Sequence, residues 1–109
     1  MNKERRYYFY MMQSISRRVL YCGVTSTLAQ RVRQHKEHVF EGFSSKYNTT
    51  RLVYYEVYDD IRKAIARETQ VKKWRRAKKE YLIQLLNPHW TDLSEAWGKP
   101  VKLLTPRLD

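Results

Sequence analysis

The stretch that decides the fold begins with Tyr7-Tyr8-Phe9-Tyr10-Met11-Met12 and continues, after Gln13–Arg17, with Arg18-Val19-Leu20-Tyr21-Cys22-Gly23-Val24. Both runs have strand length and are rich in aromatic and β-branched residues. The segment between them is short, largely polar and turn-like. This arrangement predicts an antiparallel β-hairpin at the start of the chain.

A helix is predicted directly after this hairpin. Thr27 and Gln30 have the spacing of a capping box, in which each side chain satisfies a backbone donor at the other position. Three apolar residues and a histidine then recur at helical spacing and form one stripe, made of Leu28, Val32, His35 and Val39. The following segment from Glu41 to Asn48 contains glycine and serine, so we expect a loop there.

A third strand and two further helices complete the pattern. The run from Arg51 to Tyr58 is rich in valine and tyrosine and predicts a strand. Asp59 and Asp60 are placed to cap the next helix. Its apolar stripe consists of Ile61, Ala64, Ile65 and Val71. A last helix is predicted from about Ala77 to Leu86 and ended by Pro88, with three residues expected to be buried, Tyr81, Leu82 and Leu85.

The order β-β-α-β-α-α indicates a small α/β (α+β) domain, in which helices flank a three-stranded, mostly antiparallel sheet. The chain has 109 residues, which suffices for one compact domain. We therefore predict a single domain over residues 1–97. Residues 98–109 carry Gly98, Pro100 and Pro106 and are expected to form a loose C-terminal tail.

The charge of the chain points to a polyanionic partner. Lys and Arg number 22 against 11 Asp and Glu, a net charge of +11. Such a field attracts phosphate backbones, and nucleic acid is the expected partner. A membrane surface is not favoured, because no segment pairs a basic face with a wide apolar one. Six cations fall within residues 72–79, where a nucleic-acid contact is favoured over a solvated helix face, and they are Lys72, Lys73, Arg75, Arg76, Lys78 and Lys79.

Cysteine content and the N-terminus bear on where the protein works. Cys22 is the only cysteine, so no intrachain disulfide can form, and no Cys/His cluster has zinc spacing. Neither a signal-peptide core nor a membrane span is recognisable. We expect a cytoplasmic protein that is monomeric by default, although the aromatic strands and three tryptophans leave a dimer open.

Glu68 falls in the middle of the predicted apolar stripe of its helix, where an unpaired carboxylate would be costly. Its partner is therefore either an arginine or a hard cation such as Mg²⁺ or Mn²⁺. Arg31 and His35 lie four residues apart on one helix face, at the border of the apolar stripe. Arg31 suits bidentate contact with a phosphate or an ion pair with Glu68, and His35 is either a site residue or an ordinary core histidine.

The hairpin offers three further candidates. With the turn centred near Ser16, Tyr10 and Tyr21 are expected roughly opposite each other, where two phenols either belong to the core or flank a reacting water. Gly23 stands at the end of the second strand. The absence of a Cβ there would let a phosphate approach the backbone.

Taken in order, these segments resemble the GIY-YIG nuclease superfamily, in particular its short single-domain bacterial members of the excinuclease-subunit-like and UPF0213-like kind. The two signature tripeptides correspond to Tyr8-Phe9-Tyr10 and Tyr21-Cys22-Gly23. The likeness extends from residue 6 to residue 95. Its other segments are Thr27–His35 with Arg31, Gly42–Asn48, Leu52–Glu56, Ala64–Glu68 followed by Lys72-Lys73-Trp74, and Asn87-Pro88-His89-Trp90.

The resemblance implies a GIY-YIG fold and a metal-dependent endonuclease that hydrolyses DNA phosphodiester bonds, with single-stranded or branched DNA as expected substrates in repair, recombination or the control of incoming DNA. It implies that Glu68 holds one Mg²⁺ or Mn²⁺ and that Arg31 binds the scissile phosphate. Tyr10 or Tyr21 would position or deprotonate the attacking water. His35 would assist and Asn87 would support the site. The alternatives are a nucleic-acid-binding module with little catalysis and a nuclease acting on RNA.

Overall fold

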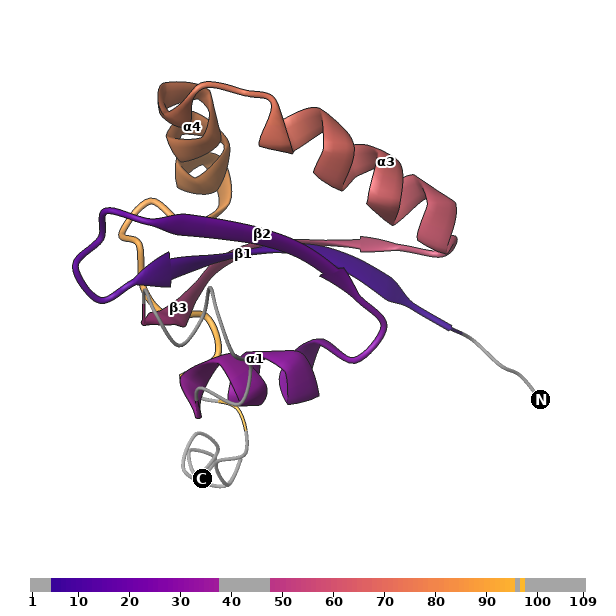
Figure 1. The fold of residues 1–109 in the computed structure, drawn as a ribbon, viewed down its shortest axis with the longest axis horizontal. Coiled ribbons are helices and arrows are strands. Elements are labelled where there is room, and N and C mark those ends of the chain that lie inside the picture. Colours follow the sequence, from indigo (N-terminus) through magenta and orange to yellow (C-terminus); the bar gives the residue numbers. More distant parts are fainter. Residues whose placement is uncertain (1–4, 38–47, 96, 98–109) are drawn as a thin grey trace, which may run out of the picture.

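The computed structural model describes residues 5–37, 48–95 and 97. Its strands are β1 (Tyr7–Ser14), β2 (Leu20–Thr25) and β3 (Thr49–Tyr58), which form one antiparallel sheet in the order β2-β1-β3. The described helices are α1 (Leu28–Lys36), α3 (Ile61–Lys72) and α4 (Arg76–Leu86). The predicted order β-β-α-β-α-α and the three-stranded α+β architecture are therefore confirmed (Figure 1).

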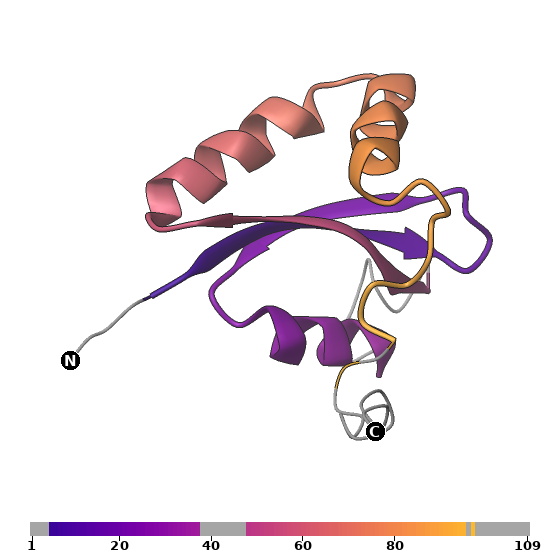
Figure 2. The same ribbon diagram turned by 180° about the vertical axis from the view of Figure 1, so that it is seen from behind.

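The sheet is the middle layer, with α3 and α4 on one face and α1 on the other (Figures 1 and 2). The alternation of side chains along β1 supplies both cores, because successive residues point to opposite faces. Phe9 and Met11 belong to the cluster on the α3–α4 face, and Tyr10 and Met12 belong to the cluster on the α1 face. All four are at most 1% exposed, so the central strand is buried on both sides.

The hairpin of β1 and β2 is longer than predicted. Gln13 and Ser14, expected in the turn, instead continue β1, and both are buried. Arg17 takes the left-handed conformation of a tight turn, with φ 68°. Arg76 of α4 holds this turn by donating hydrogen bonds to the carbonyl oxygens of Arg17, at 2.9 Å, and Arg18. The register pairs Tyr10 with Gly23 and Met12 with Tyr21.

This register corrects the expectation that the two tyrosines lie opposite each other. Tyr10 and Tyr21 instead share the α1 face as diagonal neighbours, with ring centroids 6.1 Å apart. The reason is that the turn is centred between Ser16 and Arg17, whereas direct pairing of the two tyrosines would need a centre between Ile15 and Ser16.

The predicted capping box of α1 is wrong. Thr27 is the N-cap residue but its side chain caps no backbone donor. Thr25 Oγ1 instead accepts a hydrogen bond from the Thr27 amide, at 3.0 Å, so the turn before the helix is organised by the preceding threonine. The stripe of Leu28, Val32 and His35 is buried as predicted, and Val39 lies outside the described residues.

Helix α3 is capped as predicted but buries a different face. The Asp60 carboxylate accepts a hydrogen bond from the Arg62 amide, at 2.8 Å. Ala64 and Val71 are fully buried, whereas Ile61 and Ile65 are 44% and 47% exposed, so those two expected core positions are wrong. The small Ala64 side chain brings the helix close to the sheet and fixes its rotation.

Helix α4 departs from prediction in the same way. Ile83 is its fully buried residue, whereas Tyr81 and Leu85, which were expected in the core, are 64% and 66% exposed. The helix packs near one end of a narrow sheet, so only a thin stripe finds a surface to cover. Leu82 is half-buried and packs against the cluster on the α3–α4 face, so its predicted burial is partly confirmed.

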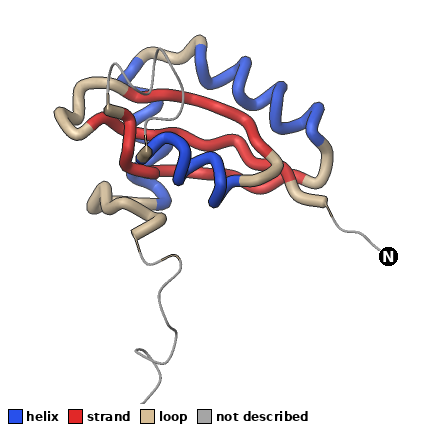
Figure 3. Tube along the Cα trace, turned by 60° about the horizontal axis from the view of Figure 1, so that its bottom comes forward, coloured by secondary structure: helices blue, strands red, loops and turns tan. Residues whose placement is uncertain are grey.

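The segment after α4 runs back past the sheet to the α1 side (Figures 2 and 3). The Leu93 amide donates to the Leu52 carbonyl of β3 at 2.8 Å, and Lys36 of α1 pairs with Asp92 at 2.6 Å. Of the predicted loop from Glu41 to Asn48, only Asn48 is described, and the tail 98–109 lies outside the described residues. Among the helices of the described ranges, none has the length and apolarity needed to cross a membrane.

Candidate active site

Three of the predicted site residues meet on the α1 face of the sheet. Tyr10 comes from β1, Tyr21 from β2 and His35 from the last turn of α1. The His35 ring lies 5.9 Å from the Tyr10 ring and 4.9 Å from the Tyr21 ring, centroid to centroid. Tyr10 Oη and His35 Nε2 share a hydrogen bond of 3.2 Å. Three chain segments therefore build one compact cluster, with Tyr21 as its half-buried, outermost member.

Gly23 has a role in this cluster that differs from the prediction. It faces the Tyr10 phenol, and a Cβ at Gly23 would lie only 2.6 Å from Tyr10 Oη. The open space over the glycine is thus already filled by a side chain of the protein. On this side Gly23 serves to admit the phenol, and its expected contact with a phosphate stays a prediction.

Burial and neighbouring charges tune the cluster. Desolvation raises the pKa of Tyr10 well above its usual value, Tyr21 adds to the rise, and the Arg31 guanidinium opposes it in part. Burial, followed by the positive charge of Arg31, lowers the pKa of His35 to about 4. At neutral pH the cluster therefore contains a protonated Tyr10 phenol and an uncharged imidazole beside a fixed guanidinium.

Glu68 approaches from the other face of the sheet, on α3. Its side chain is 21% exposed, so the prediction of a carboxylate in the middle of the buried stripe is wrong. The shifted rotation of α3 places it at the margin of that stripe. Its negative charge still acts on both Tyr10 and Cys22, which locates it beside β2, the edge strand of the sheet.

Glu68 is the carboxylate whose charge acts on the tyrosine–histidine cluster, and its setting bears on the predicted metal. It is paired with the Lys72 ammonium at 3.2 Å, so the position already accommodates a cation. Among the described residues no cluster of three or more His, Cys, Asp or Glu side chains is present, which argues against a zinc-like cage within these ranges. A partly exposed single carboxylate fits Mg²⁺ or Mn²⁺, which keep water ligands and often take one or two protein carboxylates.

The six cations of residues 72–79 do not act as one surface. Lys72 and Lys79 line a cleft of about 230 Å³ together with Leu20, Tyr21 and Cys22. Arg76 is engaged with the hairpin turn and with Glu80, at 2.9 Å. Lys78 lies over the Trp74 ring, 4.3 Å from its centroid. The remaining two cations, Lys73 and Arg75, are exposed and do not line this cleft.

Asn87 has a structural setting. It is 4% exposed and is the C-cap residue of α4. Its Nδ2 donates to the carbonyls of Val53, at 3.0 Å, and Thr91, at 2.9 Å. Its Oδ1 accepts hydrogen bonds from the amide and hydroxyl of Thr91, at 3.1 and 3.2 Å. The amide thus joins β3 to the chain after α4, and its expected support for the site stays a prediction.

The arginine that the sequence analysis did not single out is Arg67. Its guanidinium pairs with the Glu56 carboxylate, with Nη2–Oε2 at 3.0 Å. Burial alone would raise the pKa of Glu56, but hydrogen bonds from Arg67, Tyr54 and Tyr58 bring it below its usual value. The signal lay in the alternating Tyr54, Glu56 and Tyr58, which share one face of a strand.

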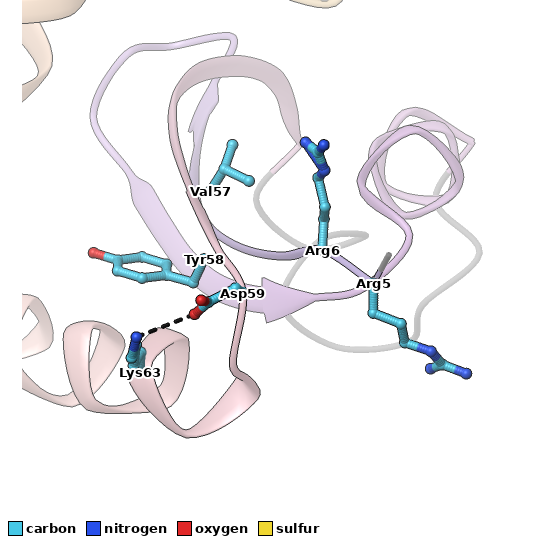
Figure 4. A pocket seen from close by; sticks show the side chains of 6 residues that line it. All are labelled: Arg5, Arg6, Val57, Tyr58, Asp59 and Lys63. Atoms are coloured by element: carbon cyan, nitrogen blue, oxygen red, sulfur yellow. Dashed lines mark hydrogen bonds and ion pairs between the residues drawn. The ribbon is translucent and has the colours of Figure 1, made fainter. Parts of the chain in front are cut away.

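A second cleft, of about 770 Å³, lies at the far end of the sheet and contains none of the predicted catalytic residues (Figure 4). Lys63 pairs there with Asp59 at 3.1 Å, and the side chains of Arg5 and Arg6 point in different directions. Its cations do not converge on a common point. The candidate site is therefore the tyrosine–histidine cluster and not this wider hollow.

Comparison with known proteins identifies the family of the chain. The model of the GIY-YIG catalytic domain matches residues 6–81. A UPF0213 protein of Haloquadratum walsbyi is 28% identical over 78 residues, which cover 72% of this chain and 88% of that protein. The solution structure of a UPF0213 protein from Bacillus halodurans has a similar fold, with a TM-score of 0.53 and 21% identity over 87% of this chain and 99% of that one. The chain, with Tyr10, Tyr21 and Arg31 inside the matched range, therefore belongs to the GIY-YIG catalytic domain family.

Proposed function

We propose that this protein is a metal-dependent endonuclease that hydrolyses phosphodiester bonds of DNA, with single-stranded or branched DNA as substrate. The observation that carries the proposal is the meeting of Tyr10, Tyr21 and His35 beside β2, within reach of the charges of Arg31 and Glu68. A module that only binds nucleic acid has no use for a carboxylate next to its basic surface, because that carboxylate repels phosphates.

Within this proposal the two tyrosines have different tasks. Tyr10 is 1% exposed, and its raised pKa keeps the phenol protonated, which suits a structural donor. Tyr21 is half-buried and is one of the residues that line the cleft beside β2, so of the two phenols it is the more accessible to an attacking water. We assign Tyr21 to orient and deprotonate that water, with Tyr10 and the uncharged His35 holding its ring in place.

Arg31 and Glu68 complete the proposed site. Arg31 binds the scissile phosphate and stabilises the charge that develops on its oxygens. Glu68 would hold the divalent ion. When bound, such an ion supplies Lewis-acid stabilisation of the leaving group and the phosphate. Asn87 keeps β3 and the chain after α4 in register behind this site.

The test is cleavage of labelled single-stranded DNA, duplex DNA, branched DNA and RNA with Mg²⁺, with Mn²⁺ and with EDTA. Arg31→Ala is expected to lower the rate by about 10²–10³-fold. Arg33→Ala, which changes an exposed arginine on the same helix, is the matched control and should stay close to wild type.

Glu68→Gln is compared with Glu80→Gln, because each removes the carboxylate of an (i,i+4) ion pair. Only the first should abolish metal-dependent cleavage. Binding of every substrate without cutting in either metal would refute the enzyme and favour the binding module. Preferential cutting of the RNA would show that RNA, and not DNA, is the substrate.

A further inference from the structure

The cleft beside β2 joins cations from two helices to a proposed catalytic residue. Lys72 is the last residue of α3 and Lys79 lies in the first turns of α4. Both line the same cleft as Tyr21 and Cys22. Their positive charges reach the buried Cys22 thiol, whose pKa is raised by burial and lowered by Lys79 and then Lys72. Two ammonium groups thus converge over one side of the edge strand.

The size and chemistry of the cleft limit what it binds. Its volume of about 230 Å³ is below the roughly 300–1,000 Å³ of sites that enclose whole small molecules. Its polar ligands are ammonium groups, which recognise a compact anion as point charges. Lys79 forms no ion pair within residues 5–37, 48–95 and 97, whereas the Lys72 ammonium is ion-paired with the Glu68 carboxylate. The positive charge of Lys79 is therefore left for a bound anion to neutralise.

We propose that this cleft binds a backbone phosphate adjacent to the one that is cleaved, with Lys79 as its principal ligand and Lys72 as its second. This proposal rests on the proposed nuclease function, because Tyr21 is the wall shared by the cleft and the tyrosine–histidine cluster. A phosphate on Lys79 fixes the path of the strand across β2. The neighbouring phosphate is thereby placed beside the Tyr21 hydroxyl and the Arg31 guanidinium.

The arrangement also couples the two subsites. Lys72 neutralises Glu68 in the structure, at 3.2 Å, and faces the cleft at the same time. With Glu68 holding a divalent ion, Lys72 would be available to a phosphate in the cleft as its counter-charge. Ion and strand would then favour each other's binding, as reciprocal linkage requires.

The test uses the cleaved DNA with a single uncharged methylphosphonate placed in turn at each position around the cut bond. Wild type should lose cleavage at one position beside that bond, by about fivefold for one partly exposed cationic contact. Lys79→Met should be slower on the unmodified strand and indifferent to that position. Lys73→Met, the same change in the same basic run but outside the cleft, should keep the full sensitivity.

Binding measured by fluorescence anisotropy in EDTA separates this proposal from the nuclease itself. Lys79→Met should bind about fivefold more weakly than wild type, with a salt dependence lower by about one phosphate contact, and Lys73→Met should lose less. Equal effects of the two substitutions in both assays would overturn the phosphate subsite while leaving catalysis intact. Absence of all cleavage, with the difference in binding retained, would refute the nuclease and the placement of the subsite beside a cut bond, and would support Lys79 only as a phosphate contact.

Discussion

Gly23→Ala tests whether the Tyr10 phenol depends on the open space over β2. A Cβ at this position would lie 2.6, 2.7 and 2.8 Å from Oη, Cζ and Cε1 of Tyr10. These distances are far inside van der Waals contact, which for carbon atoms is about 3.5–4.0 Å. Tyr10 is 1% exposed and in contact with Tyr21 and His35, so its ring has little room to retreat.

The magnitude follows from three contributions. The backbone at Gly23 is not left-handed, so alanine in an empty setting would stabilise the fold by about 0.4–1 kcal/mol through the unfolded chain. Overpacking of a filled core costs about 1–3 kcal/mol. Displacing the ring also breaks the bond to His35, worth about 1 kcal/mol. The expected net loss is about 2 kcal/mol, or roughly a 10 °C fall in Tm for a domain of this size.

Thermal and urea unfolding of Gly23→Ala measure this loss, and a double-mutant cycle with Tyr10→Leu assigns it. Leucine is shorter than tyrosine and has no atoms where the outer part of the phenol ring lies. In the Tyr10→Leu background, Gly23→Ala should therefore be neutral or slightly stabilising. Stabilisation of the wild-type chain by Gly23→Ala, or an equal cost beside leucine and beside tyrosine, would contradict a steric conflict with the Tyr10 phenol.

Three further outcomes are expected. Because the pKa of His35 is about 4 when folded and about 6.5 when unfolded, only the unfolded chain takes up the proton between these values. Stability therefore falls as pH is lowered through this window, and wild type should lose about 2 kcal/mol more than His35→Gln between pH 7 and 4.5 in urea unfolding; equal losses would contradict the shift. Asn87→Ala should lower the free energy of unfolding by about 2–4 kcal/mol, measured as a lower Tm, because the buried Val53 carbonyl loses its donor and the other hydrogen bonds of the amide are lost as well. A Tm near that of wild type would contradict the role of Asn87 in joining β3 to the chain after α4. Arg67→Met should destabilise by about 2 kcal/mol at pH 7 and by less at pH 4, where Glu56 without its guanidinium is protonated; a loss independent of pH would oppose this.

Helix α3 shows where sequence patterns are insufficient. Its ends and its Asp60 cap were predictable from local chemistry, because both depend on neighbouring residues. Its rotation was not, since Ile61 and Ile65 outweigh Ala64 in any count of apolar residues. In the structure Ala64 faces the sheet and is fully buried, because its small side chain lets the helix approach closely, and the two isoleucines stay half-exposed at the rim.

The candidate site divides in the same way. Alternation along a strand and (i,i+4) spacing along a helix suffice to predict that Tyr10 shares a face with its neighbours and that Arg31 and His35 are adjacent. Cross-strand register depends on where the turn is centred, so the pairing of Tyr10 with Gly23 required the structure. The separation of Arg76 from Lys79 depends on the placement of α4 against the hairpin, which no local pattern encodes.

The narrowness of the sheet explains how groups from both faces act on one phenol. α1 and α3 lie on opposite sides of the sheet, and the charges of Arg31 and Glu68 nevertheless both act on the Tyr10 phenol. Tyr10 stands on the strand next to that edge, and Gly23 lets its hydroxyl extend over β2. A further strand paired with β2 would cover this approach. An edge strand ordinarily invites such pairing, and lysines beside it discourage it. The ammonium groups of Lys72 and Lys79 that we assign to the substrate lie beside this edge, where they would also discourage the pairing of a further strand.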